Sequence, residues 1–248
     1  MIFYLRFWAV LLGAVMVAGT ESPSSADALV SDLRAARPPE NMEIRGTLRI
    51  RDAEGHRTRI PFRYQVILGD KEWQSVYETE STDARPAEKL VVTFTPGKAP
   101  RYAFSRAPES GAPLGKPVEL SGDEAMIPFA QSDFWLADLA MSFLHWPRQT
   151  LVENLTIKRR QGRVCHTLES ENPSAGAKGY TRVQSWIDRE TGQPITAEAF
   201  DAAGRQLKEF QIGSVKKVDG RWQLKNMEMR NLLTDSQTVL EFIYETKE

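Results

Sequence analysis

The sequence predicts a mainly β protein with a few helices, and three observations lead to this prediction. Apolar and polar residues alternate along several short segments, which is typical of strands that bury one face. Turn residues such as Gly, Asp and Asn separate these segments at short intervals, which favours antiparallel hairpins. Of the 248 residues, 41% are hydrophobic, which suffices for the core of one large all-β domain or two small ones.

The N-terminus has the pattern of an export signal. Met1–Arg6 contains a basic residue, Phe7–Ala18 is apolar throughout, and small residues follow. The apolar run is too short to span a bilayer comfortably and matches the central region of a secretory signal. We therefore predict a signal peptide over residues 1–19 and a disordered linker over residues 20–26. An N-terminal membrane anchor is the alternative.

The residues around the expected cleavage site indicate a soluble, exported protein. The stretch "VAGT" would be a bacterial lipoprotein box if Thr20 were cysteine, so no thiol is available for lipidation. Cys165 is the only cysteine, which excludes an intrachain disulfide. An exported protein of this size without disulfides fits a bacterial periplasm. The formal net charge of −1 gives no global sign of nucleic-acid binding.

The first half of the mature chain predicts one helix and then strands. Residues 26–37 have apolar side chains at helical spacing and end at Pro38-Pro39. In "RIPFRYQVILGD" the period changes to two, which indicates a strand with one apolar face. Gly69-Asp70 then turns the chain into a second strand, "KEWQSVYETE". Residues 89–95 and 101–106 predict a further pair of strands, and the Pro- and Gly-rich residues 107–117 predict a loop.

Residues 131–146, "QSDFWLADLAMSFLHW", predict a second helix. Ser132 or Asp133 can cap its start, and Pro147 ends the segment. Its apolar residues follow i, i+3, i+4, i+7 spacing, and most of its other residues are apolar as well. A helix that is apolar around most of its girth is buried on more than one side.

The rest of the chain predicts an antiparallel meander. Residues 151–160 and 163–170 flank a turn at Gln161-Gly162, and a polar loop follows at 171–179. Further strands then succeed one another through short turns; they are "YTRVQSWI", "PITAEAF", "RQLKEFQIGSVKKV", "RWQLKNMEMRN" and "QTVLEFIYE". The whole pattern indicates about eleven strands and two helices.

Catalytic motifs are absent from the sequence. It contains no G-x-S-x-G, H-E-x-x-H, Walker loop, G-x-G-x-x-G or C-x-x-C. Cys165 and His166 are adjacent on a predicted strand, so their side chains point to opposite faces and cannot act as a pair. The other histidines, His56 and His145, lie on different elements. We expect no enzymatic activity, no cofactor and no metal.

A basic cluster at a predicted hairpin tip has two interpretations. Lys158, Arg159, Arg160 and Arg163 form either a solvated turn or a contact patch for an acidic partner.

The aromatic and apolar content also has two interpretations. The chain contains 6 Trp, 11 Phe and 7 Met. These residues could fill an ordinary sandwich core. Alternatively, a curved sheet could present an apolar concave face, with the second helix as a plug, and so form a cavity for an acyl chain.

The C-terminal half resembles the outer-membrane lipoprotein-sorting family, the LolA-like proteins. The similarity rests on "WID-x-x-T-G-x-P", "A-x-x-x-D-x-x-G-x-x-L-K", "DGRW", "MEMRN" and "T-x-L-E-F", and on the upstream "DFWLADLAMSFLHWP". It covers about residues 131–245. The resemblance implies an unclosed antiparallel β-barrel with a helical lid over a hydrophobic cavity, formed here by a single domain over residues 27–248.

The resemblance also implies a function. Its best-known members carry lipoproteins across the periplasm by sheltering their acyl chains. We accordingly expect a soluble, monomeric periplasmic carrier that binds acyl chains or other lipid for transport towards the outer membrane, with partners in the inner and outer membranes and no nucleic acid. The alternative is a regulatory protein that senses envelope stress through a surface of the same half-barrel.

Candidate cavity residues come from the apolar strand faces and from the predicted lid. They are Phe62, Tyr64, Trp73, Phe134, Trp135, Leu139, Phe143 and Trp186.

Overall fold

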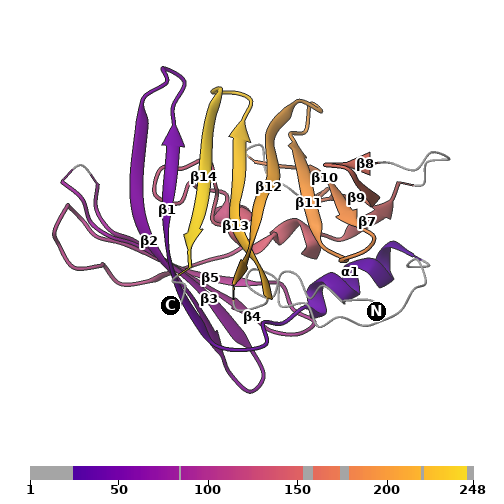
Figure 1. Cartoon of the computed structure of the whole chain (residues 1–248), viewed down its shortest axis with the longest axis horizontal. Coiled ribbons are helices and arrows are strands. Elements are labelled where there is room, and N and C mark those ends of the chain that lie inside the picture. Colours follow the sequence, from indigo (N-terminus) through magenta and orange to yellow (C-terminus); the bar gives the residue numbers. More distant parts are fainter. Residues whose placement is uncertain (1–24, 84, 153–158, 174–178, 219–220, 245–248) are drawn as a thin grey trace. The chain divides into compact units, whose positions relative to one another are not determined.

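The computed structural model describes residues 25–83, 85–152, 159–173, 179–218 and 221–244 (Figure 1). The expected signal peptide and residues 20–24 of the expected linker lie outside these residues. Chain contacts divide the protein into two compact units: unit 1 is Met1–Pro39 with Phe143–Met227, and unit 2 is Glu40–Ser142 with Glu228–Glu248. The single domain over residues 27–248 stays a prediction.

Unit 2 contains seven complete strands and two 3-10 helices. They are β1 (Met42–Arg51), β2 (Arg57–Leu68), β3 (Trp73–Thr79), β4 (Glu88–Phe94), β5 (Arg101–Arg106), β6 (Val118–Leu120), η1 (Gly122–Ala125), η2 (Asp138–Ala140) and β14 (Ser236–Ile243).

Unit 1 contains the α-helix and the other complete strands. They are α1 (Ala26–Ala35), β7 (Arg148–Leu151), β8 (Arg159–Arg160), β9 (Arg163–Glu171), β10 (Arg182–Asp188), β11 (Pro194–Phe200) and β12 (Gln206–Val218). Two elements span the division between the units, the 3-10 helix η3 (Ser142–His145) and the strand β13 (Arg221–Asn231).

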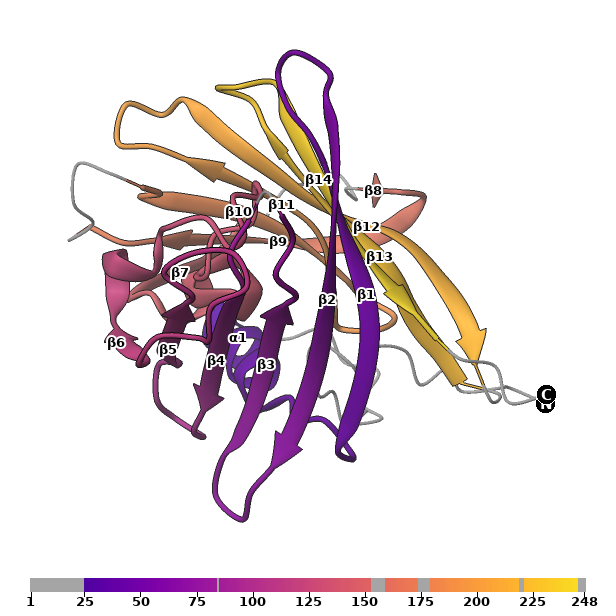
Figure 2. The same cartoon turned by 90° about the vertical axis from the view of Figure 1, so that its left-hand side faces the viewer.

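The strands form one 14-stranded sheet. Its order is β6-β5-β4-β3-β2-β1-β14-β13-β12-β11-β10-β9-β7, and β8 pairs with β9. Because the order ends at β6 and at β7, the sheet is open, and every pairing with a described register is antiparallel (Figures 1 and 2). The predicted mainly β class is therefore confirmed. The sequence-based count of about eleven strands is too low, because it omits β1 and β6 and expects one strand over residues 151–160. The ends of that strand fall in β7 and β8, and its residues 153–158 lie outside the described residues.

The inner face of unit 2 follows from strict alternation on its strands. On β2, Ile60, Phe62, Tyr64 and Val66 are buried, and the residues between them are exposed or half-buried. Gly46 on β1 makes close packing possible at one point of this face. A Cβ atom there would collide with the ring of Phe62 and with the Glu241 carbonyl, so any side chain at this position would displace the aromatic ring.

The helix expected over residues 131–146 does not form, and this prediction is wrong. The segment contains only the short 3-10 helices η2 and η3. Ala130, Gln131 and Met141 have φ values of 52°, 56° and 47°, and such left-handed residues interrupt a right-handed helix. The Asp138 carboxylate accepts the backbone N–H of Trp135 at 2.8 Å. The helical spacing of apolar residues therefore reflects burial of the segment, not an α-helix.

The first expected helix is confirmed as α1. The Ser25 hydroxyl accepts the N–H of Ala28 at 3.2 Å and caps its start. Its buried side chains are Leu29, Val30 and Leu33, and the helix packs against β7 in unit 1. Within the described residues, no helix has both the length and the apolar character needed to cross a membrane.

Candidate functional site

The inner face of unit 2 carries a connected cluster of aromatic rings. Tyr64 lies between Tyr77 and Phe242, with ring centroids 4.8 Å and 5.7 Å away. Phe62 meets Phe242 edge-on at 5.8 Å, and Tyr77 meets Phe129 at 6.2 Å. Edge-to-face pairs at these separations are favourable beyond their buried area. The strands thus present an aromatic surface on the inner side of the sheet.

Hydroxyl groups interrupt this aromatic surface. The Tyr64 hydroxyl lies 3.0 Å from the Ser75 hydroxyl. The buried hydroxyls of Tyr77 and Tyr102 lie near those of Tyr64 and Ser142, without a well-formed hydrogen bond among the described residues. Burial raises the pKa of Tyr77 well above its usual value, and the neighbouring Tyr64 raises it further. Burial likewise raises the pKa of Tyr102, so both hydroxyls stay neutral at physiological pH. The inner face thus offers polar groups within an apolar surface.

Residues 129–142 fold over this face, and we call them the covering segment. Their buried apolar side chains are Phe129, Ala130, Phe134, Leu136, Ala137, Leu139 and Ala140. The backbone of Phe129 donates to the Phe134 carbonyl at 2.9 Å, so the segment begins as a tight loop. All residues of the covering segment are described, and none is in an α-helix.

Asp133 attaches the covering segment to β14. Its buried carboxylate accepts the Ser236 hydroxyl at 2.5 Å and the Thr238 hydroxyl at 2.7 Å. The Asp133 backbone N–H donates to the same Thr238 hydroxyl oxygen at 2.9 Å. Hydrogen bonds to a charged group are among the stronger ones, so this contact is a principal attachment.

Glu88 on β4 attaches the other side of the same loop. Its carboxylate accepts the Ala130 N–H at 2.6 Å and pairs with the Arg106 guanidinium at 2.6 Å. The Arg85 guanidinium donates to the Ala130 carbonyl at 3.0 Å. Glu88 is only 3% exposed, and a buried carboxylate requires such partners. The covering segment is therefore held by side-chain contacts at Ala130 and Asp133.

Six of the eight candidate cavity residues lie in unit 2. Phe62, Tyr64 and Trp73 are buried on the strands, and Trp73 stacks on Phe94 with centroids 4.0 Å apart. Phe134 and Leu139 are buried in the covering segment. Trp135, also in this segment, is half-buried.

Phe143 and Trp186 lie in unit 1. Phe143 is half-buried in η3. Trp186 is buried in a cluster with Cys165 and Ile195, and the Arg160 guanidinium lies 4.0 Å from its ring centroid.

Two arginines of the basic cluster at the hairpin tip form ion pairs within unit 1. Arg160 pairs with Glu198 at 2.8 Å, and Arg163 pairs with the buried Asp188 at 2.6 Å. Lys158 lies outside the described residues. These two arginines thus stabilise the hairpin.

A pocket of about 540 Å³ opens beside β1, β2 and β3 in unit 2. Phe62 is the one candidate cavity residue among its lining residues. Apolar contributions also come from Pro61, Leu114 and Ile243, and Arg45 is one of its charged lining residues. Its lining thus combines the inward-facing Phe62 with outward-facing residues such as Arg45.

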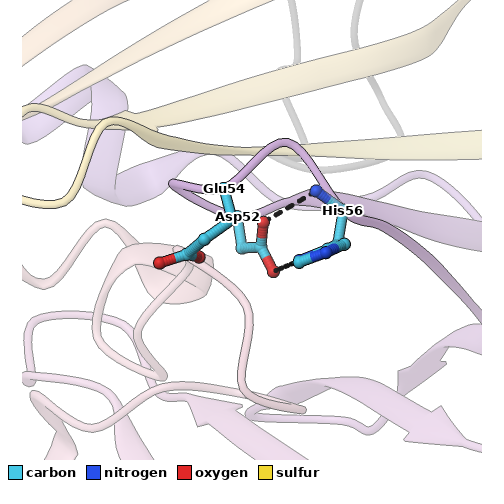
Figure 3. Close-up of side chains that lie close together, drawn as sticks. All are labelled: Asp52, Glu54 and His56. Carbon is cyan, nitrogen blue, oxygen red and sulfur yellow. Dashed lines mark hydrogen bonds and ion pairs between the residues drawn. The ribbon is translucent and has the colours of Figure 1, made fainter.

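One cluster of metal-ligating side chains was not expected from the sequence. Asp52, Glu54 and His56 place possible ligand atoms within 4.8 Å of one another at the β1–β2 turn (Figure 3). The Asp52 carboxylate already accepts the His56 backbone N–H at 2.8 Å and contacts ring Nδ1 at 3.1 Å. Desolvation opposes ionisation of Asp52, but the contacts with His56 outweigh it and lower the pKa overall. Asp52 therefore organises the turn. In the sequence, the only indication of this cluster was the D-x-E-x-H spacing of its three members.

A family model described as "-like: Uncharacterized protein" matches residues 113–244, which is more than half of the chain. The chain belongs to this family. No curated protein has a significantly similar sequence. The matched residues of the uncharacterised family include the covering segment and the C-terminal meander.

Solved structures show the fold of this family member. A DUF1329 family protein from Desulfovibrio piger is 18% identical, with a TM-score of 0.68 over 88% of this chain and 90% of that one. A domain from Vibrio parahaemolyticus, provisionally described as an outer membrane lipoprotein-sorting protein, has the same identity and TM-score over 87% and 89%. A LolA superfamily protein from Nitrosomonas europaea is 16% identical, with a TM-score of 0.58 over 90% and 94%. The expected LolA-like open-barrel fold is confirmed.

Proposed function

We propose that the protein is a carrier that shelters acyl chains of lipoproteins, or other lipid, between the inner face of unit 2 and the covering segment. One observation carries this proposal: an apolar segment covers an aromatic sheet face, and side-chain hydrogen bonds hold it there. Such a cover can move away without unfolding an α-helix or a strand. Covers of this kind open and close over ligand sites in many proteins.

The energetics of exchange support a lipid as the ligand. Moving the covering segment away would expose side chains such as Phe134 and Leu136, which are now 1% and 0% exposed. Burying apolar surface contributes about 25 cal/mol per Å², so an acyl chain that takes the vacated place offsets this loss. A small polar ligand could not do so. The proposed cavity residues are therefore those of the inner face and the cover.

We also propose the setting in which the carrier works. The signal-like N-terminus and Thr20 at the lipoprotein box support an exported, non-lipidated protein in the periplasm. We further propose that it acts as a monomer. Transport towards the outer membrane would require partners at both membranes. No enzymatic activity, cofactor or metal is part of the proposal.

Asp133→Asn tests the carrier directly. The amide keeps the shape of the side chain but loses the charge that two hydroxyls contact, so the cover should release more easily. We expect a fluorescent fatty acid to bind the variant several-fold faster than the parent protein. Asp201→Asn, at a β11–β12 turn residue paired with Arg205 in unit 1, is the matched control and should bind at the parental rate.

Native mass spectrometry of the protein isolated from the periplasm provides the second measurement. We expect bound lipid on the parent protein. If neither co-purified lipid nor dye binding is found for the parent and for Asp133→Asn, the carrier function is wrong.

A regulatory binding function is the second candidate, and the attachment of the covering segment favours it. Side-chain hydrogen bonds at Ala130 and Asp133 hold the segment against the sheet. A protein whose cover stays closed would act through its surface, for example in sensing envelope stress. A pull-down of membrane proteins separates the two functions: one stoichiometric partner supports regulation, and a range of lipoproteins supports transport.

A further inference from the structure

The outer face of the β1–β2 hairpin is rich in arginine. On both strands the even-numbered residues are mostly buried on the inner face, and the odd-numbered residues point outward. Among these outward residues is a set that we call the arginine face: Arg45, Arg49, Arg51, Arg57, Arg59 and Arg63. All of them are exposed except Arg51, which is half-buried. The chain as a whole has a formal net charge of −1, so this positive charge is local.

The strand register places these arginines opposite one another. Arg45 pairs with Arg63, Arg49 with Arg59, and Arg51 with Arg57. Figure 2 shows the two strands side by side. Like charges directly opposite on neighbouring strands destabilise a sheet. Folding alone would favour alternating charges at these positions, so the arrangement requires another explanation.

Neighbouring acidic groups neutralise only part of the arginine face. Arg63 contacts Glu78 at 3.2 Å and Glu43 at 3.9 Å. Arg49 contacts Glu241 at 3.5 Å.

Within the part of the chain that the structure describes, the other arginines have no acidic partner. Arg51 donates to the Asp235 backbone carbonyl at 3.3 Å. Among the described residues, Arg45, Arg57 and Arg59 have no ion pair or side-chain hydrogen bond. Their guanidinium groups are available to an external anion.

Apolar groups lie among these cations. Pro61 lies between Arg59 and Arg63 on the outward side of β2 and is exposed. Ile243, 54% exposed, lies opposite Arg45 across the β1–β14 pair. Pro61, Ile243, Arg45 and Arg63 all line the 540 Å³ pocket. The surface thus combines phosphate-binding groups with exposed apolar ones.

We propose that the arginine face docks the protein on an anionic phospholipid surface. Guanidinium groups bind phosphate with a fixed, bidentate geometry, and headgroup phosphates form a dense two-dimensional array of such ligands. The exposed Ile243 and Pro61 would meet the apolar boundary beneath the headgroups, as apolar residues do on other proteins that lie on membranes. A nucleic acid would satisfy the charge but leave these apolar groups unused.

Docking goes beyond the carrier function, because it requires neither a bound acyl chain nor movement of the covering segment. Its test therefore uses a different readout. Sedimentation with vesicles of equal parts phosphatidylglycerol and phosphatidylcholine measures docking, and vesicles of phosphatidylcholine alone measure the neutral background. Every variant is isolated from the periplasm, so all of them share the same N-terminus and differ only at the substituted positions.

Arg57→Ser combined with Arg59→Ser is the test variant. Each arginine near an anionic membrane raises the membrane partition coefficient roughly fivefold. The double variant should therefore bind anionic vesicles roughly 25-fold more weakly. Binding by the parent protein should also weaken as salt is raised. Removing repelling charges should leave stability to urea unchanged or raised, so a folding defect cannot explain the loss.

The matched control is Lys98→Ser combined with Arg189→Ser, which removes the same charge from exposed positions outside the arginine face. We expect it to bind anionic vesicles within twofold of the parent. Equal weakening of both double variants, undiminished binding of the test variant, or equal binding to neutral vesicles would each overturn the proposal. Binding to a duplex DNA but not to anionic vesicles would overturn it in favour of a nucleic acid. The test variant should bind the fluorescent fatty acid as well as the parent protein does. This result would separate membrane docking from the carrier function.

Discussion

Unit 1 is covered by an α-helix, whereas the inner face of unit 2 is covered by a segment of loops and 3-10 turns. Helix α1 satisfies most of its own backbone groups and contributes three buried apolar side chains. The covering segment instead depends on Glu88, Asp133 and Asp138 to satisfy backbone or neighbouring polar groups. A helical cover is thus specified by its own sequence, and an irregular cover is specified together with the sheet beneath it.

This difference has an energetic consequence. Each side-chain hydrogen bond of the irregular cover is separately removable, with a net contribution of about 0.5–1.5 kcal/mol for a neutral bond and 1.5–3 kcal/mol for one to a charged group. A helix gains or loses its contacts as one cooperative body. Stepwise release is therefore expected of the covering segment and not of α1.

Phe134→Ala should give the largest effect on stability. Phe134 is 1% exposed, and removing a buried phenylalanine ring costs about 3–5 kcal/mol. Phe143→Ala is the matched control, because it removes the same group from a half-buried position and should cost less than half as much. Urea unfolding measures both, and equal losses would show that Phe143 belongs to the packed core as well.

The acid sensitivity of unit 1 should come from His145. Burial, assisted by the nearby charge of Arg34, lowers the pKa of His145 to about 4. Its unfolded pKa is near 6.5, so the native state favours the neutral ring. Stability is then fully present above pH 6.5 and is lost as pH falls from about 6.5 to about 4. Because the ring is partly exposed, we expect a loss of about 1–2 kcal/mol, less than the whole shift.

Unfolding of the parent and of His145→Gln at pH 7 and pH 4.5 measures this effect. The variant should lose less stability over that interval. If both proteins lose the same amount, protonation of other groups accounts for the acid sensitivity, and the contribution assigned to His145 is wrong.

Ser25→Ala should have the smallest effect on stability. It measures how much the cap of α1 contributes. The change removes the hydroxyl that accepts the Ala28 N–H, and loss of such a cap costs about 1 kcal/mol. Ser236→Ala removes a hydroxyl that contacts Asp133 and serves for comparison in unit 2. We expect only the second change to alter the rate of fatty-acid binding, measured with the fluorescent ligand.

Much of the fold could be predicted, because the local sequence determines helix α1 and the strands of the C-terminal meander. The apolar spacing of residues 26–37 and the following prolines indicated α1, and the short turns after Trp186 indicated the meander. Strand β1 was missed. Its outward residues are charged and Gly46 interrupts its apolar face, so its pairing with β2 and β14 is a tertiary property.

The candidate site could be predicted only in part. Alternation on β2 identified Phe62 and Tyr64 as inward residues, and both are buried in the aromatic cluster. The attachments of the cover could not be found, because Asp133 meets its partners across 103 and 105 residues of sequence. The helical spacing in this segment was misleading, since a buried 3-10 segment can place apolar residues at similar intervals.

The single thiol of the chain has a practical consequence. Cys165 is buried, and burial raises its pKa, so it reacts slowly with thiol reagents at neutral pH. A cysteine introduced at an exposed position would be the only fast-reacting thiol in an otherwise unaltered chain. A spin label or fluorophore could then be attached at one chosen place, and two such positions would provide a spectroscopic ruler for motion of the protein in solution.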